Sequence, residues 1–348
     1  MKRLYDISWK IDEPTYREDP ALSQSQLTKY LREGFNNLNK LSEKSESSSL
    51  TFGSAVDAII TGSMKEFSDR FIVSDLKVDD DTAKLVKIIY NFYKDTEFRN
   101  LPVTAVSQIL KENGFWPADK WTDEKRFEGF IKKDNVKEYF DLLKQSQDKT
   151  VINQETYQDV INCVDALRQS PQTCFYFQPN NEFEPDYYRE YQLKFKSEFN
   201  GVKYRGMLDL VFVNHVTKTI YPIDLKTSSH TEWDFFKSFL EWGYQIQARL
   251  YWRLLQNAIQ KDDFYKDYTL ANYRFIVINK KTLTPLVWEF PDTQKIGTLY
   301  YGKNKQIELR DPFDVGKELN SYLTTNPIVP NGIDILGENN LISWLNTI

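Results

Sequence analysis

The sequence is poor in the two residues that most often hold transition metals. Its 348 residues include two cysteines and two histidines. Cys163 and Cys174 match neither the C-x-x-C spacing nor a pairing with histidine, so we expect free thiols in a reducing compartment. So few cysteines cannot supply the thiolates of an iron–sulfur cluster. So few histidines argue against a His-rich zinc site and against a His-dependent hydrolase.

Long apolar runs are also missing. No segment approaches the roughly 20 residues that a membrane helix needs. Residues 1–6 carry charges with no apolar stretch behind them, so we expect no signal peptide. Together these absences predict a cytoplasmic protein with no membrane partner.

Charge is low in net terms but unevenly distributed. The net charge is −5, which is unusual for a stable DNA binder. Residues 189–256, however, hold ten Lys and Arg against seven Asp and Glu. A local basic groove on an acidic body suits an enzyme that binds nucleic acid and releases it, or one that encloses it. A hydrophobic fraction of 41% and an aromatic fraction of 15% favour a folded core over disorder.

The order of helical and strand patterns predicts an α/β (α+β) fold with a central mixed sheet flanked by helices. We expect one domain over 1–290, with a core at about 22–64 and 155–290 and a helical insertion at about 65–150. Residues 291–348 would form a C-terminal extension of unknown role. Expected helices are 23–41, 52–60, 156–169, about 233–256 and 314–323; expected strands are 190–199, 202–213, 219–225, 273–279 and 286–290.

Two of these strands carry the most informative residues. Asp209 ends one apolar run, and Asp224-Leu225-Lys226 ends the next. Because strand side chains alternate between faces, Asp224 and Lys226 point the same way. Neighbouring carboxylates in an apolar strand are costly unless a cation sits between them. Carboxylates that hold a divalent cation beside an ammonium are what metal-dependent phosphodiester cleavage needs. A surface hairpin with salt bridges is the alternative.

The residues between Asp209 and Asp224 are consistent with a hairpin that places these two carboxylates opposite each other. If Asp209 faces Asp224 across an antiparallel pair, the turn centres between Val216 and Thr217. The turn-forming residues Asn214, His215 and Lys218 cluster at this point.

Gln247 and Tyr251 lie one helical turn apart, with Tyr244 on the same face. An amide and a phenol there could orient water or grip a phosphate, although an amphipathic helix packed on the sheet gives the same pattern. Asp57 stands in an apolar stretch, where a buried acid needs a partner or a metal. It could also lie on an exposed helix face.

Basic residues in the same region are candidates for contacts to the DNA backbone. A solvated helix face explains any one of them equally well. The three residues are Lys237, Arg249 and Arg253.

Taken together, the pieces resemble the PD-(D/E)xK nucleases, in particular the phage recombination exonucleases of the exodeoxyribonuclease VIII (RecE) type. The resemblance covers about residues 22–290. It includes the Ser-x-Ser-x-Leu segment from Ser23, Gly53 with Asp57, the G-M-L-D and I-D-L-K-T strands that end at Asp209 and Thr227, the Q-x-x-x-Y helix from Gln247, and the strand 275–278. D-x-K followed about 20 residues later by Q-x-x-x-Y is considerably more specific than D-x-K alone.

The resemblance implies a restriction-endonuclease-like core and a role for each matching residue. Asp209, Asp224 and the Leu225 carbonyl would bind Mg²⁺ or Mn²⁺, and Lys226 would activate the attacking water. Gln247 and Tyr251 would orient the active site and the scissile phosphate, and Tyr244 would contact DNA. Asp57 departs from the family, in which many members carry a metal-binding histidine, but its carboxylate still suits Mg²⁺.

The resemblance also implies partners and a setting. The substrate would be DNA, as duplex ends or single strands, and the chain would form a homo-oligomeric ring and act with a single-strand annealing protein. A phage-encoded protein would work in the cytoplasm of a bacterial host. Two alternatives remain open at this stage: a structure-specific endonuclease on the same fold, and a degenerate DNA-binding protein without catalysis.

Overall fold

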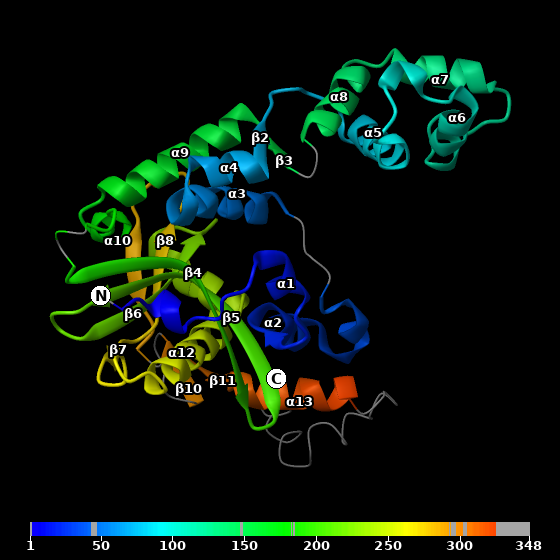
Figure 1. Ribbon diagram of the computed structural model, residues 1–348. Helices are drawn as coiled ribbons and strands as arrows, with labels where there is room; N and C mark the ends of the chain where they lie inside the picture. The colour runs from blue at the N-terminus through cyan, green and yellow to red at the C-terminus, as the bar shows by residue number, and fades with distance from the viewer. Residues whose placement is uncertain are drawn as a thin grey trace. The chain divides into compact units, whose positions relative to one another are not determined.

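The structure is a computed structural model, and it describes residues 2–42, 47–146, 149–181, 183, 185–291, 293, 297–301 and 305–324. The chain forms two compact units, each with its own hydrophobic core (Figure 1). The sheet unit comprises Met1–Gly53 and Cys163–Ile348, and the helical unit comprises Ser54–Asn162.

A mixed sheet with helices around it forms the centre of the sheet unit, as the sequence predicted. Its main path runs β1-β5-β6-β8-β9, with β4 added beside β5 and β7 beside β6. β4 and β6 are antiparallel to β5, whereas β8 is parallel to β6. The strands are β1 (Leu22–Ser23), β4 (Tyr187–Phe199), β5 (Val202–Asn214), β6 (Thr219–Thr227), β7 (Thr269–Leu270), β8 (Arg274–Ile278) and β9 (Leu286–Glu289).

The hairpin of β4 and β5 is the longest in the sheet. Asn200 and Gly201 form its turn with φ of 51° and 78°, the positive values that a two-residue hairpin turn requires. This turn fills the gap between the expected strands 190–199 and 202–213, and Asn-Gly is a favoured pair for it. The register continues along both strands, and Gln192, between the pairs Tyr191–Leu210 and Leu193–Leu208, adopts φ of 53°.

Helices cover the sheet. In the sheet unit, α12 packs on β4 and β5, and α13 packs on α2 and α12 (Figure 1). The helical segments are η1 (Leu4–Ile7), α1 (Glu13–Glu18), α2 (Gln24–Glu33), η2 (Gly34–Lys40), α10 (Cys174–Phe177), η5 (Glu232–Asp234), α11 (Phe235–Glu241), α12 (Tyr244–Gln260) and α13 (Pro312–Thr324). A small hairpin of β10 (Gly297–Tyr301) and β11 (Lys305–Leu309) precedes α13.

Glycine divides two segments that the sequence predicted as single helices. The stretch expected over 233–256 is interrupted at Gly243, which adopts φ of 64° between α11 and α12. The stretch expected over 23–41 likewise changes at Gly34, with φ of 67°, from the α-helix α2 to the 3₁₀ segment η2. Left-handed backbone at glycine is a common way to end a helix. The late helix expected at 314–323 is confirmed as α13, and residues 325–348 of the predicted extension lie outside the described residues.

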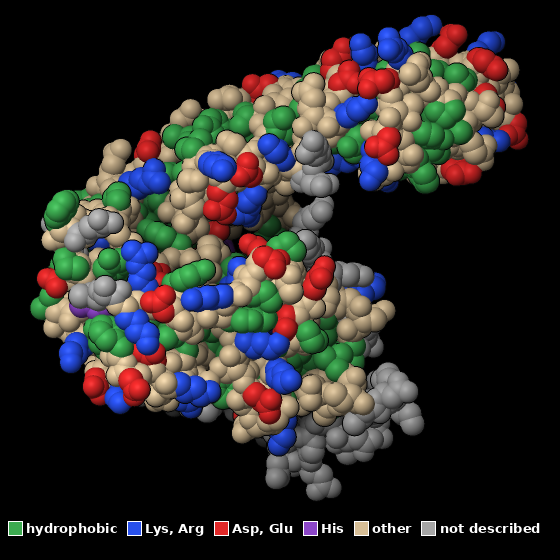
Figure 2. Space-filling model, in the orientation of Figure 1, with side chains coloured by type: hydrophobic (Ala, Val, Ile, Leu, Met, Phe, Trp, Pro, Cys, Tyr) green, Lys and Arg blue, Asp and Glu red, His purple; other side chains and the backbone are tan. Residues whose placement is uncertain are grey.

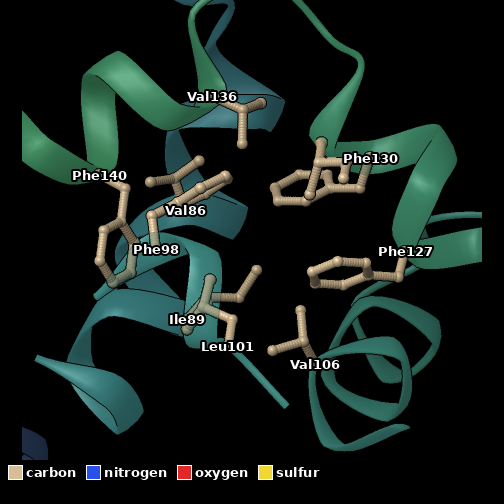
Figure 3. Close-up of a pocket in the computed structure, with 10 residues that line it drawn as sticks. Val86, Ile89, Phe98, Leu101, Val106, Phe127, Phe130, Val136 and Phe140 are labelled. Atoms are coloured by element: carbon tan, nitrogen blue, oxygen red, sulfur yellow. The ribbon is translucent and has the colours of Figure 1, made fainter. Parts of the chain in front are cut away.

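The helical unit is built on a separate apolar core. Figure 3 shows side chains of α5, α6, α7 and α8 converging on it, among them Phe130 and Phe140, which are 2% and 1% exposed. Its elements are α3 (Ser48–Asp57, begun in the sheet unit), η3 (Ala58–Gly62), α4 (Met64–Arg70), β2 (Phe71–Val73), α5 (Asp80–Tyr93), η4 (Phe98–Asn100), α6 (Val103–Glu112), α7 (Asp123–Ile131), α8 (Val136–Ser146), β3 (Thr150–Ile152) and α9 (Gln154–Gln169, ended in the sheet unit). β2 and β3 form a short parallel pair.

Of the helices in the described ranges, none is both long and apolar enough to cross a membrane. Acidic and basic side chains are interspersed on the face of the sheet unit that Figure 2 shows, without a large area of one sign.

We expect Phe140→Ala to lower the free energy of unfolding of the helical unit by about 3–5 kcal/mol, because the ring is buried and its removal leaves a cavity. Urea unfolding, followed by hydrogen exchange of the α5 and α8 amides, measures this change. Phe92→Ala is the matched control, since Phe92 is 70% exposed and should change stability by at most about 0.5 kcal/mol. Equal effects of the two variants would contradict the described core.

Candidate active site

The two carboxylates that the sequence singled out lie on neighbouring strands. β5 pairs with β6 from Asn214–Thr219 to Leu210–Ile223, and the next step of this register places Asp209 opposite Asp224. The turn falls between Asn214 and Thr219, as the sequence predicted. The backbone N–H of Leu225 donates a hydrogen bond of 3.1 Å to Oδ2 of Asp209, which connects the two strands at this point.

Asp224 is the centre of the cluster and is 1% exposed. Its Oδ1 accepts a hydrogen bond from the side-chain amide of Gln247, and its Oδ2 lies 2.6 Å from Nζ of Lys226. The structure thus brings together the D-x-K strand and the first residue of the Q-x-x-x-Y helix. A buried carboxylate needs such partners, because removing an isolated charge from water is costly.

Lys226 is positioned by its ion pair and by an aromatic ring. Its side chain is 19% exposed, and Nζ lies 4.8 Å from the centroid of the Tyr244 ring. Burial acts to lower the pKa of Lys226, but the charge of Asp224, with smaller contributions from Tyr244 and Asp209, outweighs it and raises the pKa above its usual value. Lys226 is therefore a cation at neutral pH, suited to electrostatic stabilisation rather than to proton abstraction.

Tyr251 stands one turn after Gln247 on α12 and is 9% exposed. Burial, followed by the nearby charges, raises the pKa of its phenol well above the usual value, so it stays protonated. Gly206 of β5 makes room for the ring: a Cβ there would lie 2.6 Å from Cδ1 of Tyr251 and 2.9 Å from Cδ1 of Leu254. The glycine of the G-M-L-D segment thus lets α12 approach the strand that carries Asp209.

Tyr273 is a site neighbour that the sequence reasoning missed. It is fully buried, and its hydroxyl forms no hydrogen bond with a described residue. Burial raises the pKa of this phenol, and the charges of Asp224 and Asp209 raise it further. The sequence marked Tyr273 only as the start of a strand, because a tyrosine in an apolar run gives no signal of its surroundings.

The residues predicted to contact DNA have different environments. Lys237 is exposed and pairs with Asp234 at 3.2 Å, and Arg253 is exposed and donates to Gln256 at 2.6 Å. Arg249, by contrast, is 5% exposed, stacks on Phe290 and donates to the carbonyl of Leu309. This placement does not support a phosphate contact by Arg249, because α12 turns this side chain into the core.

The metal contacts predicted for Asp57 and for the carbonyl of Leu225 remain predictions. Asp57 ends α3 in the helical unit, where its backbone carbonyl and Oδ1 accept hydrogen bonds from Thr61 at 3.0 and 3.2 Å. The π-helical turn η3 follows it directly, a distortion that often accompanies functional sites. Leu225 lies between the two key residues of β6, and the metal contact of its carbonyl stays a prediction.

A divalent cation fits the carboxylate pair chemically. Oδ2 of Asp224 is buried, and among the described residues the ammonium of Lys226, 2.6 Å away, compensates its charge. Asp209 supplies a second carboxylate on the neighbouring strand. Within the described ranges, no group of three or more His, Cys, Asp or Glu side chains is placed to hold a metal ion. Mg²⁺ commonly takes only a small number of protein carboxylates and completes its shell with water and phosphate oxygens.

Comparison with known proteins adds little to this geometry. No protein-family model matches the chain, and no curated protein matches it. Among solved structures, the chain is similar to the crystal structure of a candidate exonuclease from Eubacterium rectale. The two are 14% identical, the alignment covers 91% of this chain and 84% of that chain, and the TM-score is 0.40. A likeness at this identity and TM-score carries no functional argument.

We expect Gly206→Ala to destabilise the sheet unit by about 1–3 kcal/mol, because the added methyl group overpacks the contact with Tyr251. A double-mutant cycle with Tyr251→Ala in urea unfolding measures the coupling. The cost of Gly206→Ala should fall when the ring is absent. A cost that is the same in both backgrounds would show that the strand and α12 do not meet at this point.

Proposed function

We propose that this protein is a Mg²⁺- or Mn²⁺-dependent deoxyribonuclease. The observation that carries the proposal is the cluster on β5, β6 and α12: Asp209 stands opposite a buried Asp224, which contacts both Lys226 and Gln247. Two carboxylates, a permanent cation and an orienting amide are the parts that metal-assisted phosphodiester hydrolysis needs.

Each residue has a task in this reaction. Asp209 and Asp224 would hold the metal, which when bound supplies an activated water and neutralises charge at the phosphate. Gln247 fixes the orientation of Asp224 by its hydrogen bond, as groups behind metal ligands commonly do. Lys226, held as a cation, would stabilise the attacking hydroxide and the charge that develops on the phosphate. Tyr251, kept protonated by burial, would donate a hydrogen bond to the phosphate or to its water. Attack in line would release the 3′-oxygen and leave a 5′-phosphate product.

The biological setting that we propose is end resection. An exonuclease that digests one strand from a duplex end would leave single-stranded DNA for a partner annealing protein, in phage-type recombination or repair in the bacterial cytoplasm. A homo-oligomeric ring around DNA would let a chain of net charge −5 remain on its substrate without a large basic surface.

Incubation with end-labelled linear duplex and covalently closed circular DNA tests the proposal. With Mg²⁺ or Mn²⁺ we expect loss of the linear DNA only, and with EDTA no cleavage. Lys226→Gln should lower the rate by on the order of 100-fold or more, because charge stabilisation is lost. Lys317→Gln, on the exposed side of α13, is the control and should keep the wild-type rate.

Other results of this assay would revise the proposal. Cleavage of the closed circle would identify an endonuclease on the same fold. Absence of cleavage of either substrate would favour a DNA-binding protein without catalysis. Wild-type activity in Lys226→Gln would mean that the active site lies elsewhere.

Metal binding can be measured apart from catalysis. We expect calorimetric titration with Mn²⁺ to show a site that Asp224→Asn removes. Gln247→Leu should weaken it by about 10–100-fold, because the carboxylate loses its orienting hydrogen bond. Gln260→Leu makes the same change at an exposed position of the same helix and should leave the affinity unchanged. Equal Mn²⁺ affinities of the two leucine variants would show that Gln247 does not contribute to metal binding.

A further inference from the structure

A groove lies along β4, on the side away from its pairing with β5. Its volume is about 350 Å³, within the range of about 300–1,000 Å³ that small-molecule sites occupy. We call it the N-terminal groove, because one wall is the segment before α1 and the other is the middle of β4. The lining residues are Tyr5, Ser8, Trp9, Lys10, Ile11, Asp12, Tyr191, Gln192, Leu193 and Lys194.

The wall formed by the N-terminal segment is fixed to β4. The backbone N–H groups of Leu4 and Tyr5 donate to the carboxylate of Glu190 at 2.9 and 2.6 Å. Further along, the N–H of Trp9 donates to the carbonyl of Lys194 at 2.7 Å. The groove is therefore a preformed feature of the sheet unit, held at one end by the Glu190 carboxylate and at the other by a main-chain hydrogen bond.

The lining carries two lysines and one acid, so its net charge is +1. Nζ of Lys10 lies 5.1 Å from the centroid of the Tyr5 ring, and Nζ of Lys194 donates to the carbonyl of Ile11 at 3.0 Å. Among the described residues, neither lysine forms an ion pair with a carboxylate. The one acid of the lining, Asp12, accepts hydrogen bonds from the N–H and the hydroxyl of Thr15 as the N-cap of α1. The charges of Asp12 and Lys194 interact, and the net charge of +1 that remains favours an anionic ligand.

The groove also has aromatic surface. Trp9, Tyr5 and Tyr191 line it, and Trp9 is half-buried, with Tyr16 edge-on to its ring at 5.9 Å and Nζ of Lys196 at 4.9 Å from its centroid. These contacts hold the indole in place, and because Lys196 lies over one face of the ring, a base would stack on the other face. Aromatic rings beside lysines are the combination by which proteins bind single-stranded nucleic acid without reading its sequence.

The position of the groove relates it to the candidate active site. Gln192 lines the groove, and the register of β4 on β5 places it opposite Asp209. Gln192 also adopts a positive φ of 53°. Unusual backbone conformations in non-glycine residues tend to occur at functional sites. The groove is therefore one strand away from a proposed metal ligand.

From these observations we infer that the N-terminal groove binds a single strand of DNA close to the site of hydrolysis. A base would stack on Trp9, and the adjoining phosphates would contact Lys10 and Lys194. This inference rests on the proposed function, because it assigns the groove to the DNA on which the nuclease acts. It adds a subsite to that function and names the residues that form it.

Equilibrium binding in EDTA tests the subsite without cleavage. The probe is a thymidine oligonucleotide with a terminal fluorophore, and anisotropy is followed over a series of salt concentrations with the full-length chain. Lys10→Gln and Lys194→Gln should each weaken binding and lower the slope of log K against log salt by about 0.7, the contribution of one phosphate contact in single strands. Lys317→Gln should leave the slope unchanged.

Stacking is tested with an oligonucleotide that carries 2-aminopurine. Binding of wild-type protein should quench its fluorescence, Trp9→Phe should retain most of the quenching, and Trp9→Leu should lose it and weaken binding by about 5–150-fold. Circular dichroism of each variant separates loss of stacking from loss of folding.

The outcomes separate this inference from the proposed function. Wild-type slopes in both lysine variants together with full quenching in Trp9→Leu would overturn the subsite, even if the protein cleaves DNA. Absence of any oligonucleotide binding would also overturn it. The lysine variants could lower the salt slope and Trp9→Leu could lose the quenching although the wild-type protein shows no nuclease activity. That result would support the subsite and contradict the proposed hydrolysis.

Discussion

The burial of the Asp224 charge is the constraint on which the rest of the site depends. A carboxylate at 1% exposure in the middle of a sheet is sustainable only with close compensation. Lys226, two residues further along the same strand, supplies charge, and Gln247 supplies a hydrogen bond from the helix that covers the sheet. The hydrogen bond to Gln247 therefore fixes how α12 is rotated about its axis and where it lies along the sheet. Gly206 has no Cβ, which would otherwise clash with Tyr251 in this position. The same contacts that make the acid tolerable also orient it.

The sequence predicted those parts of the fold that depend on local chemistry. The Asn200-Gly201 turn and the period of the strands set the hairpins, so the placement of Asp209 opposite Asp224 followed from the numbering and the turn residues. Strand alternation also anticipated that Asp224 and Lys226 share a face, whereas the meeting of Gln247 with Asp224 was only implied by the family resemblance.

What the sequence did not reveal depends on tertiary environment. Whether Arg249 contacts solvent or the core depends on how α12 rotates against β11, and a basic residue on an amphipathic helix carries no sign of that. The break at Gly243 was equally hidden, because glycine is tolerated inside helices as well as between them. The buried hydroxyl of Tyr273 and the positive φ of Gln192 can be recognised only once the surrounding structure is known.

The helical unit interrupts the sheet unit in the chain, and this arrangement has a consequence for the order of folding. Leu22 of β1 pairs with Tyr204 of β5, so the sheet cannot close until the whole of Ser54–Asn162 has been synthesised. The inserted unit has its own core and would fold first, since domains generally fold as units. The carboxylate pair, built from two of the later strands, would be among the last features to form.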